Sequence, residues 1–199
     1  MLQTIFALAL VLLGLGSFTG QALAQPSALT LEGVDIAESQ MLGSTKLVLN
    51  GAAIQKRAFF KTNTVAIYLP EKRDTLDSIL KQTGPQRLSI TALRSFSGSM
   101  AARQFLSDIK NFSTEEEFDQ MSKEIEFIMG IYAGIDHINK GDIILVDWIP
   151  DTGMVVTIQG KVITTGLNNP MLWDLSLRPI MSAQASDDMR TRLLGTDAP

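Results

Sequence analysis

Four polar residues that could contact a small molecule, Gln55, Arg57, Asn63 and Tyr68, fall within one stretch of the chain, residues 47–70. A fifth candidate, Gln104, follows in a later region. Amide and phenol groups donate and accept hydrogen bonds, and the guanidinium of Arg57 adds a permanent positive charge. Small-molecule pockets are mostly apolar with a few placed polar groups, and a strand that starts polar and turns apolar fits that description.

The composition excludes several kinds of chemistry. The chain has one histidine, His137, and no cysteine, which removes thiol chemistry and leaves no Ser/His/Asp arrangement to argue. With one histidine and no cysteine, the chain has too few ligands for a transition-metal site. It also has no glycine-rich phosphate loop, so we expect neither a metal nor a cofactor. The net charge of −4 predicts no general affinity for nucleic acid or anionic lipid.

Residues 47–70 predict two strands that meet at a turn, because both halves are rich in β-branched and aromatic residues. Side chains alternate between the two faces of a strand, and both faces of the second half become apolar toward Leu69. We therefore expect this strand to run from a solvated edge into the interior. The Asn50-Gly51 pair could form a tight hairpin turn or a bulge within a continuing strand.

The rest of the chain predicts an α+β fold. Helices are expected at residues 75–82, from residue 97 for about a dozen residues, and from Ser113 to about Asp136, with a capping box between Ser113 and Glu116. Strands are expected at residues 31–39, 45–49 and 87–93, and an antiparallel meander at residues 143–149, 154–159 and 161–165; two helices, 170–177 and 186–194, close the chain. This order predicts an open antiparallel sheet with a layer of helices on one face.

The N-terminal residues 1–24 have the pattern of a secretory signal. An apolar run is followed by small residues at Ala22 and Ala24, which fit a signal-peptidase site. The run has no Lys or Arg before it, so an uncleaved membrane anchor is the alternative. We expect a periplasmic protein whose single domain spans residues 25–199.

Several short segments occur in the order found in one family. They are Leu49–Gln55, Phe59-Phe60-Lys61, Val65–Pro70, Gly141-Asp142, Asp151-Thr152-Gly153, Gln159-Gly160-Lys161 and Leu193-Leu194-Gly195. Together they resemble the chalcone isomerase-like domain in the form found in bacterial exported proteins. The resemblance implies a cleft between the sheet and the helices, which in that family accepts a flavonoid precursor or, in relatives without isomerase activity, a fatty acid.

The residues that close the ring in plant chalcone isomerases are not retained. By the resemblance, their Arg corresponds to Gln55, their Thr to Asn63 or a neighbour, and their Tyr, Lys and Asn to positions near Ala101, Gln104 and Asp108. Attack by a phenolate needs a cation to hold the anionic oxygen, and Gln55 carries no charge. We therefore assign no catalytic residue.

Three functions stay open at this point. The first is a non-catalytic protein that binds an apolar ligand such as a fatty acid through Gln55, Arg57, Asn63, Tyr68 and Gln104. The second is an intramolecular lyase or isomerase with a rearranged site, and the third is a scaffold that binds another envelope protein. Arg57 could bind a carboxylate at the cleft mouth or be a solvated strand end, and Tyr68 could line the pocket or be a core aromatic with a hydrogen-bonded hydroxyl.

Overall fold

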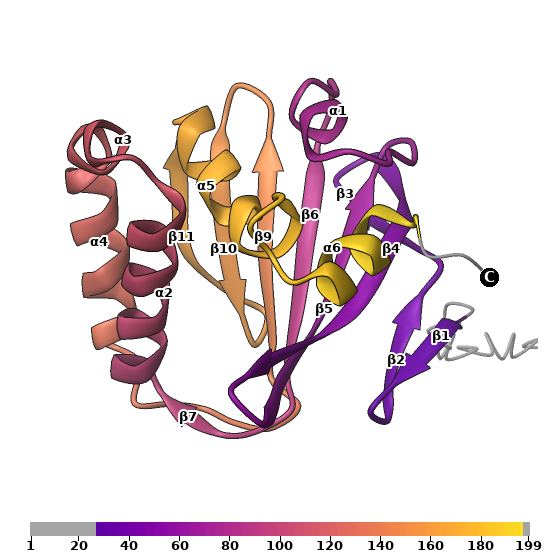
Figure 1. The fold of residues 1–199 in the computed structure, drawn as a ribbon, viewed down its shortest axis with the longest axis horizontal. Helices are drawn as coiled ribbons and strands as arrows, with labels where there is room; N and C mark the ends of the chain where they lie inside the picture. The colour runs from indigo at the N-terminus through magenta and orange to yellow at the C-terminus, as the bar shows by residue number, and fades with distance from the viewer. Residues whose placement is uncertain (1–26, 197–199) are drawn as a thin grey trace, which may run out of the picture.

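A computed structural model describes residues 27–196, which form a seven-stranded antiparallel sheet of order β11-β10-β9-β6-β5-β4-β3 (Figure 1). The strands are β3 (Ser39–Leu42), β4 (Thr45–Arg57), β5 (Phe60–Leu69), β6 (Gln86–Ala92), β9 (Ile143–Ile149), β10 (Gly153–Ile158) and β11 (Lys161–Leu167). Two further pairs, β1 (Ser27–Leu31) with β2 (Val34–Ala37) and β7 (Phe96–Ser97) with β8 (His137–Ile138), lie beside it. The predicted signal at residues 1–24 lies outside the described residues.

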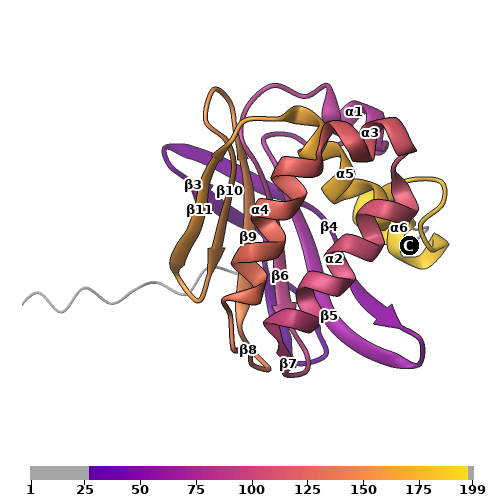
Figure 2. The same cartoon turned by 90° about the vertical axis from the view of Figure 1, so that its left-hand side faces the viewer.

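Helices cover one face of this sheet, as Figures 1 and 2 show. They are α1 (Leu76–Leu80), α2 (Gly98–Phe112), α3 (Glu115–Gln120), α4 (Ser122–Ala133), α5 (Pro170–Met181) and α6 (Asp187–Leu194). The α+β fold with an antiparallel sheet and a helical layer is therefore confirmed. Within residues 27–196, no helix is long and apolar enough to cross a membrane.

The hydrophobic core has two parts, one on each face of the sheet. The larger cluster fills the space between the sheet and the helices and includes Val65, Leu88, Ile109 and Leu175. The smaller cluster lies on the opposite face, where Leu29, Leu31 and Val34 of the β1–β2 hairpin pack against it. Its buried members are Ile36, Leu47, Leu49, Ala52, Ala66 and Tyr68. The sheet is thus apolar on both faces, as the sequence of β5 predicts.

The Asn50-Gly51 pair forms a bulge rather than a hairpin turn. The register of β4 against β5 shifts between Leu49 and Gly51, and the strand continues to Arg57. A bulge inserts one residue and so exchanges the two faces of the strand beyond it. Leu49 accordingly packs in the smaller cluster, on the face away from the helices, and Ala53 packs in the larger cluster between sheet and helices. Gln55 and Arg57 also face the helices.

The helix expected from Ser113 to Asp136 is wrong in two details. The N-cap is Thr114, whose side chain and that of Glu117 form the capping box, so the predicted pair Ser113 and Glu116 is one residue too early. The helix is also interrupted at Met121, where α3 ends and α4 begins. Both serine and threonine are good N-caps, and each is followed three residues later by a glutamate, so the local pattern does not separate them.

One more helix and one pair of short strands also differ from the prediction. Helix α5 continues past the predicted end at residue 177 to Met181 and contains Pro179. Proline has no N–H group, so the usual hydrogen bond to the carbonyl of Leu175 cannot form. The two-residue pair β7–β8, which is too short to leave a periodic pattern, was not predicted.

Candidate ligand-binding site

A cavity of about 310 Å³ lies between the sheet and helices α2, α4 and α5. Most of its lining is aliphatic or aromatic, with Val65, Leu88, Ile90, Ile144 and Val146 from the sheet and Phe105, Ile109, Ile128, Leu175 and Ile180 from the helices. These side chains come from strands and helices far apart in sequence, because adjacent strands place alternate residues on the face that the helices cover. The cleft that the family resemblance implies is present.

The polar lining includes an ion pair between the sheet and the helices. Arg57, near the end of β4, donates to a carboxylate oxygen of Asp108 on α2. The other oxygen of Asp108 accepts from Gln104 Nε2 at 3.0 Å. The side chains of Arg57 and Asp108 are 36% and 18% exposed, so the pair is at the rim of the cavity. Arg57 therefore lies at the cleft mouth, but its charge is already balanced.

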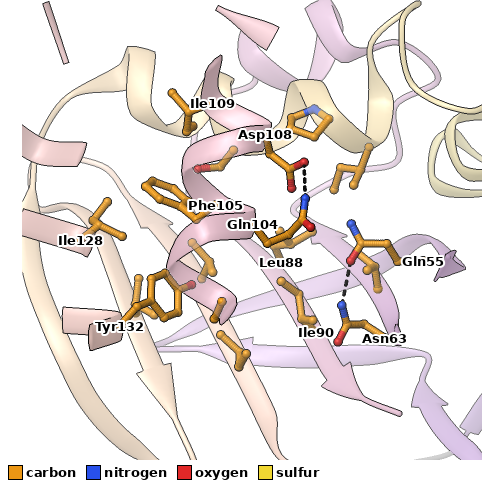
Figure 3. A pocket seen from close by; sticks show the side chains of 18 of the residues that line it. Gln55, Asn63, Leu88, Ile90, Gln104, Phe105, Asp108, Ile109, Ile128 and Tyr132 are labelled. Carbon is orange, nitrogen blue, oxygen red and sulfur yellow. Dashed lines mark hydrogen bonds between the residues drawn. The ribbon is translucent and has the colours of Figure 1, made fainter. Parts of the chain in front are cut away.

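A second polar pair lies next to it on the sheet (Figure 3). Asn63 Nδ2 donates to Gln55 Oε1 at 2.8 Å, across the β4–β5 register that sets the two residues opposite each other. Asn63 Oδ1 is buried and has no hydrogen-bond partner among the described residues. Two amides joined by one hydrogen bond leave one N–H donor and one carbonyl acceptor unpaired, whichever way the two amides are turned. This pair can therefore bind a group that donates, accepts or does both.

Two hydroxyl groups add polar positions to an otherwise apolar lining. Thr164 Oγ1 of β11 is buried without a partner in the described part of the chain. Tyr132 projects from α4, with its ring 6.1 Å from that of Phe105, and burial raises the pKa of its phenol (Figure 3). The phenol stays neutral because burial in low dielectric disfavours the phenolate. Tyr132 is thus available as a neutral hydrogen-bonding group.

Four of the five candidate residues, Gln55, Arg57, Asn63 and Gln104, line this one cavity. Tyr68 does not. It is 1% exposed, belongs to the cluster on the opposite face of the sheet, and donates to the carbonyl of Ala37 at 3.1 Å. Burial raises the pKa of Tyr68, and its hydrogen bond to Gln40 opposes this effect. Tyr68 is therefore a core aromatic residue with a hydrogen-bonded hydroxyl, and it does not line the pocket.

Sequence reasoning missed some lining residues. The carry-over from the plant enzymes placed Ala101 and Asp108 near the site, and both line the cavity, but nothing local indicated that Asp108 pairs with Arg57. Nothing in the sequence singles out Tyr132 or Thr164. A tyrosine within the apolar stripe of α4 and a threonine in a strand both read as ordinary packing residues, since their orientation depends on the tertiary structure.

The fold is that of a known protein family. The family model described as chalcone isomerase-like matches residues 28–195, nearly the whole described chain, and the protein belongs to this family. No curated protein sequence matches the chain.

A solved structure supports the same fold. The crystal structure of a fatty-acid binding protein from Arabidopsis thaliana is similar to the chain with a TM-score of 0.60. The match covers 82% of this chain and 93% of the plant protein at 10% sequence identity. At that identity the similarity establishes the fold alone.

Proposed function

We propose that the protein binds an elongated apolar ligand, such as a fatty acid, in the cavity between sheet and helices, without catalysing a reaction on it. The observation that carries the proposal is the apolar cavity of about 310 Å³ with its polar groups gathered near Arg57, Gln55 and Asn63. The volume falls at the lower end of the range of about 300–1,000 Å³ typical of small-molecule sites. The fatty-acid binding protein of similar fold supports this ligand class.

The polar groups suit the head of such a ligand. A carboxylate at the rim could accept hydrogen bonds from Arg57, from the free amide of the Gln55–Asn63 pair, or from both. The hydrocarbon tail would then extend between Leu88 and Ile144 on the sheet and Ile128 on α4. Burial of each methylene group contributes about 0.8 kcal/mol, so the tail supplies most of the affinity.

The charges around the cavity support a role without catalysis. An enolate or phenolate needs a cation or a convergent set of donors where negative charge develops. Gln55 replaces the arginine of the plant isomerases, and the positive charge of Arg57 is balanced by Asp108. No specific observation favours a lyase or isomerase with a rearranged site. The volume of the cavity argues against the scaffold alternative, in which side chains of the chain itself fill the cleft.

We further propose that the protein acts in the periplasm, because residues 1–24 have the pattern of a secretory signal. An exported carrier would meet apolar ligands that need protection from water. The site of cleavage can be read from the N-terminal sequence of the protein purified from its host. An N-terminus at Gln25 is the expected result.

The ligand is tested by native mass spectrometry of the protein purified from its host and by thermal unfolding with added fatty acids. A ligand that binds only the folded state raises the melting temperature in a concentration-dependent way. Ala101→Phe, which fills the cavity from α2, should abolish this shift. Ser107→Phe, at an exposed position of the same helix, should leave it unchanged. Absence of an adduct together with absence of a shift in the unaltered protein would contradict the proposal.

A further inference from the structure

Most of the exposed large hydrophobic residues gather at one end of the sheet. We call this the hairpin end: β4, β6 and β10 end there, and β5, β9 and β11 begin there (Figure 1). Phe59 and Phe60 lie in the β4–β5 hairpin, Ile143 and Val162 at the starts of β9 and β11, and Met100 in the first turn of α2. Of the exposed large hydrophobics in the described residues, only Met41 and Phe127 lie elsewhere.

The tip of the β4–β5 hairpin carries the most exposed of these hydrophobic side chains. Arg57 pairs with Phe60, so Ala58 and Phe59 form a two-residue turn. Phe59 is 99% exposed and Phe60 is 57% exposed. Ala58 has a φ of 52°, a conformation that such turns usually give to glycine or asparagine. A polar turn with glycine would be the stable choice in water, and a phenylalanine without contacts contributes nothing to folding.

Basic side chains surround these aromatic residues. Lys56 and Lys61 flank the turn, and the guanidinium of Arg94 lies 4.2 Å from the centre of the Phe60 ring. Lys140, whose backbone N–H bonds to Ser95, and Lys161 at the start of β11 add two exposed cations along the same end. Acidic groups lie among them: Glu32 is 2.6 Å from Lys61, and Asp188 of α6 lines a small pocket together with Lys56. Asp142, just before β9, accepts from Gln159 and from the backbone of Asn139. Around the aromatic turn the cations Lys56, Lys61 and Arg94 therefore outnumber the carboxylates Glu32 and Asp188, although the whole chain is acidic.

We propose that the hairpin end docks the protein on an anionic lipid bilayer, with Phe59 and Phe60 inserted at the level of the headgroups. Aromatic side chains are favoured at the membrane interface, and each nearby cation adds attraction to anionic headgroups. The proposal goes beyond the proposed function. It also departs from the expectation based on net charge, because the field at a surface depends on the local charges and is screened over about 8–10 Å.

The mouth of the cavity lies at the end of the molecule that would contact the bilayer. Met100 and Arg57, which line the cavity, lie on its exposed side, and Arg57 is paired with Phe60 across the hairpin. The mouth thus faces the same direction as the aromatic turn. A lipid-derived ligand would pass from the bilayer into the cavity with little exposure of its hydrocarbon to water, which is the unfavourable part of such a transfer.

A second copy of the chain fits this surface less well than a bilayer. Two hairpin ends brought face to face would set lysines and arginines against one another, and like charges in contact are repulsive. An anionic bilayer neutralises them instead. The aromatic turn is also narrow, whereas a stable protein interface buries about 800 Å² on each partner.

The test uses the full chain with a single reporter, Phe59→Trp, and vesicles of phosphatidylcholine with or without phosphatidylglycerol. The spectrum of the unaltered protein corrects for Trp148 and Trp173. We expect the emission of the new tryptophan to shift to the blue, and brominated lipid to quench it, on the anionic vesicles. Met41→Trp, an exposed site beside the start of β4 and so at the far end of the sheet, should show no change. The signal is local, so contacts made by residues 1–24 do not produce it.

Two variants test the forces separately. Phe59→Ser with Phe60→Ser should weaken binding to anionic vesicles by about tenfold or more, the range expected from losing the burial of one aromatic side chain. Lys56→Gln should weaken it about fivefold, whereas Lys46→Gln, at the far end of the same strand, should not. A Phe59→Trp spectrum that does not respond to anionic vesicles, or dimerisation lost in the Phe59→Ser, Phe60→Ser variant, would overturn the proposal. Ligand binding measured by melting temperature without vesicles is independent of either result.

Discussion

The guanidinium of Arg57 on β4 and the carboxylate of Asp108 on α2 form an ion pair across the rim of the cavity. The two residues are 51 positions apart in sequence, and both line the cavity. A ligand carboxylate that approaches Arg57 therefore meets a cation that already has a partner, and it is repelled by Asp108. The affinity of the site for acids depends on this competition.

We expect Asp108→Asn to raise the affinity for a fatty acid about fivefold, the factor that corresponds to about 1 kcal/mol for a partly exposed ion pair. The amide keeps the shape of the carboxylate but frees the charge of Arg57 for the ligand. The measurement is titration calorimetry with a fatty acid and with the alcohol of the same chain length. Affinity for the alcohol should not change, and an equal effect on both ligands would show that Arg57 does not contact the acid.

Gly51 is predicted to tolerate no side chain. A Cβ atom at this position would lie 2.1 Å from the carbonyl oxygen of Arg192 and 2.6 Å from that of Leu193, both in α6. Backbone atoms cannot move aside as a side chain can, so Gly51→Ala should destabilise the fold by about 3 kcal/mol or more. The measurement is urea denaturation.

Gly130 is the matched control for that variant. It is exposed on α4, and a Cβ added there meets nothing within 4 Å. Gly130→Ala should therefore stabilise the protein by roughly 0.5–1 kcal/mol, the difference in helix propensity between the two residues. If Gly51→Ala were equally harmless, α6 would not pack against β4 as described.

The ion pairs of Arg178 predict a pH dependence of stability. Arg178 on α5 binds Glu117 of α3 through two hydrogen bonds, of 2.8 and 2.9 Å, and lowers the pKa of Glu117 from 4.5 to about 2. A group whose pKa is lower in the folded state stabilises the fold while it is ionised in both states. The contribution of Glu117 should therefore be complete above about pH 5 and be lost as the pH falls from 4.5 to 2.

This is measured as the difference in unfolding free energy between the unaltered protein and Glu117→Gln as a function of pH. The difference should be constant near neutral pH and shrink toward zero in the acid range. Carboxylates that do not share a partner with Glu117 have the same surroundings in both proteins, so their contributions cancel. A difference that does not vary with pH would mean that the charge of Glu117 does not stabilise the folded state.

The sequence predicts the elements of the fold better than their contacts. Alternation in residues 60–69 and the meander of β9, β10 and β11 are local patterns, and both appear in the structure. The Asn50-Gly51 pair is compatible locally with either a turn or a bulge. Its outcome depends on α6, which packs closely on Gly51 and whose Leu193 carbonyl accepts from Asn50 at 2.8 Å. A contact 143 residues away in sequence leaves no local pattern.

In the candidate site, too, the sequence predicts local arrangements better than contacts between distant elements. Residues on two paired strands, such as Gln55 and Asn63, can be placed on one face by alternation and register. Tyr68 and Asn63 differ in parity along β5, which already sets them on opposite faces of a regular strand, and the structure places Tyr68 away from the cavity. Asp108, Tyr132 and Thr164 enter from other elements, and their positions depend on how helices and strands pack rather than on their own neighbours in sequence.

The two walls of the cavity differ in rigidity. The strand wall is held together by hydrogen bonds between neighbouring strands. The opposite wall includes α5, in which Pro179 leaves the Leu175 carbonyl without its helical donor, and α4, which is separated from α3 at Met121. Deformation should therefore concentrate in the helices when a long chain enters. We expect ligands of increasing length to alter amide exchange in residues 175–181 while the rates in β5 and β6 stay constant, so that one scaffold accepts a series of homologous molecules.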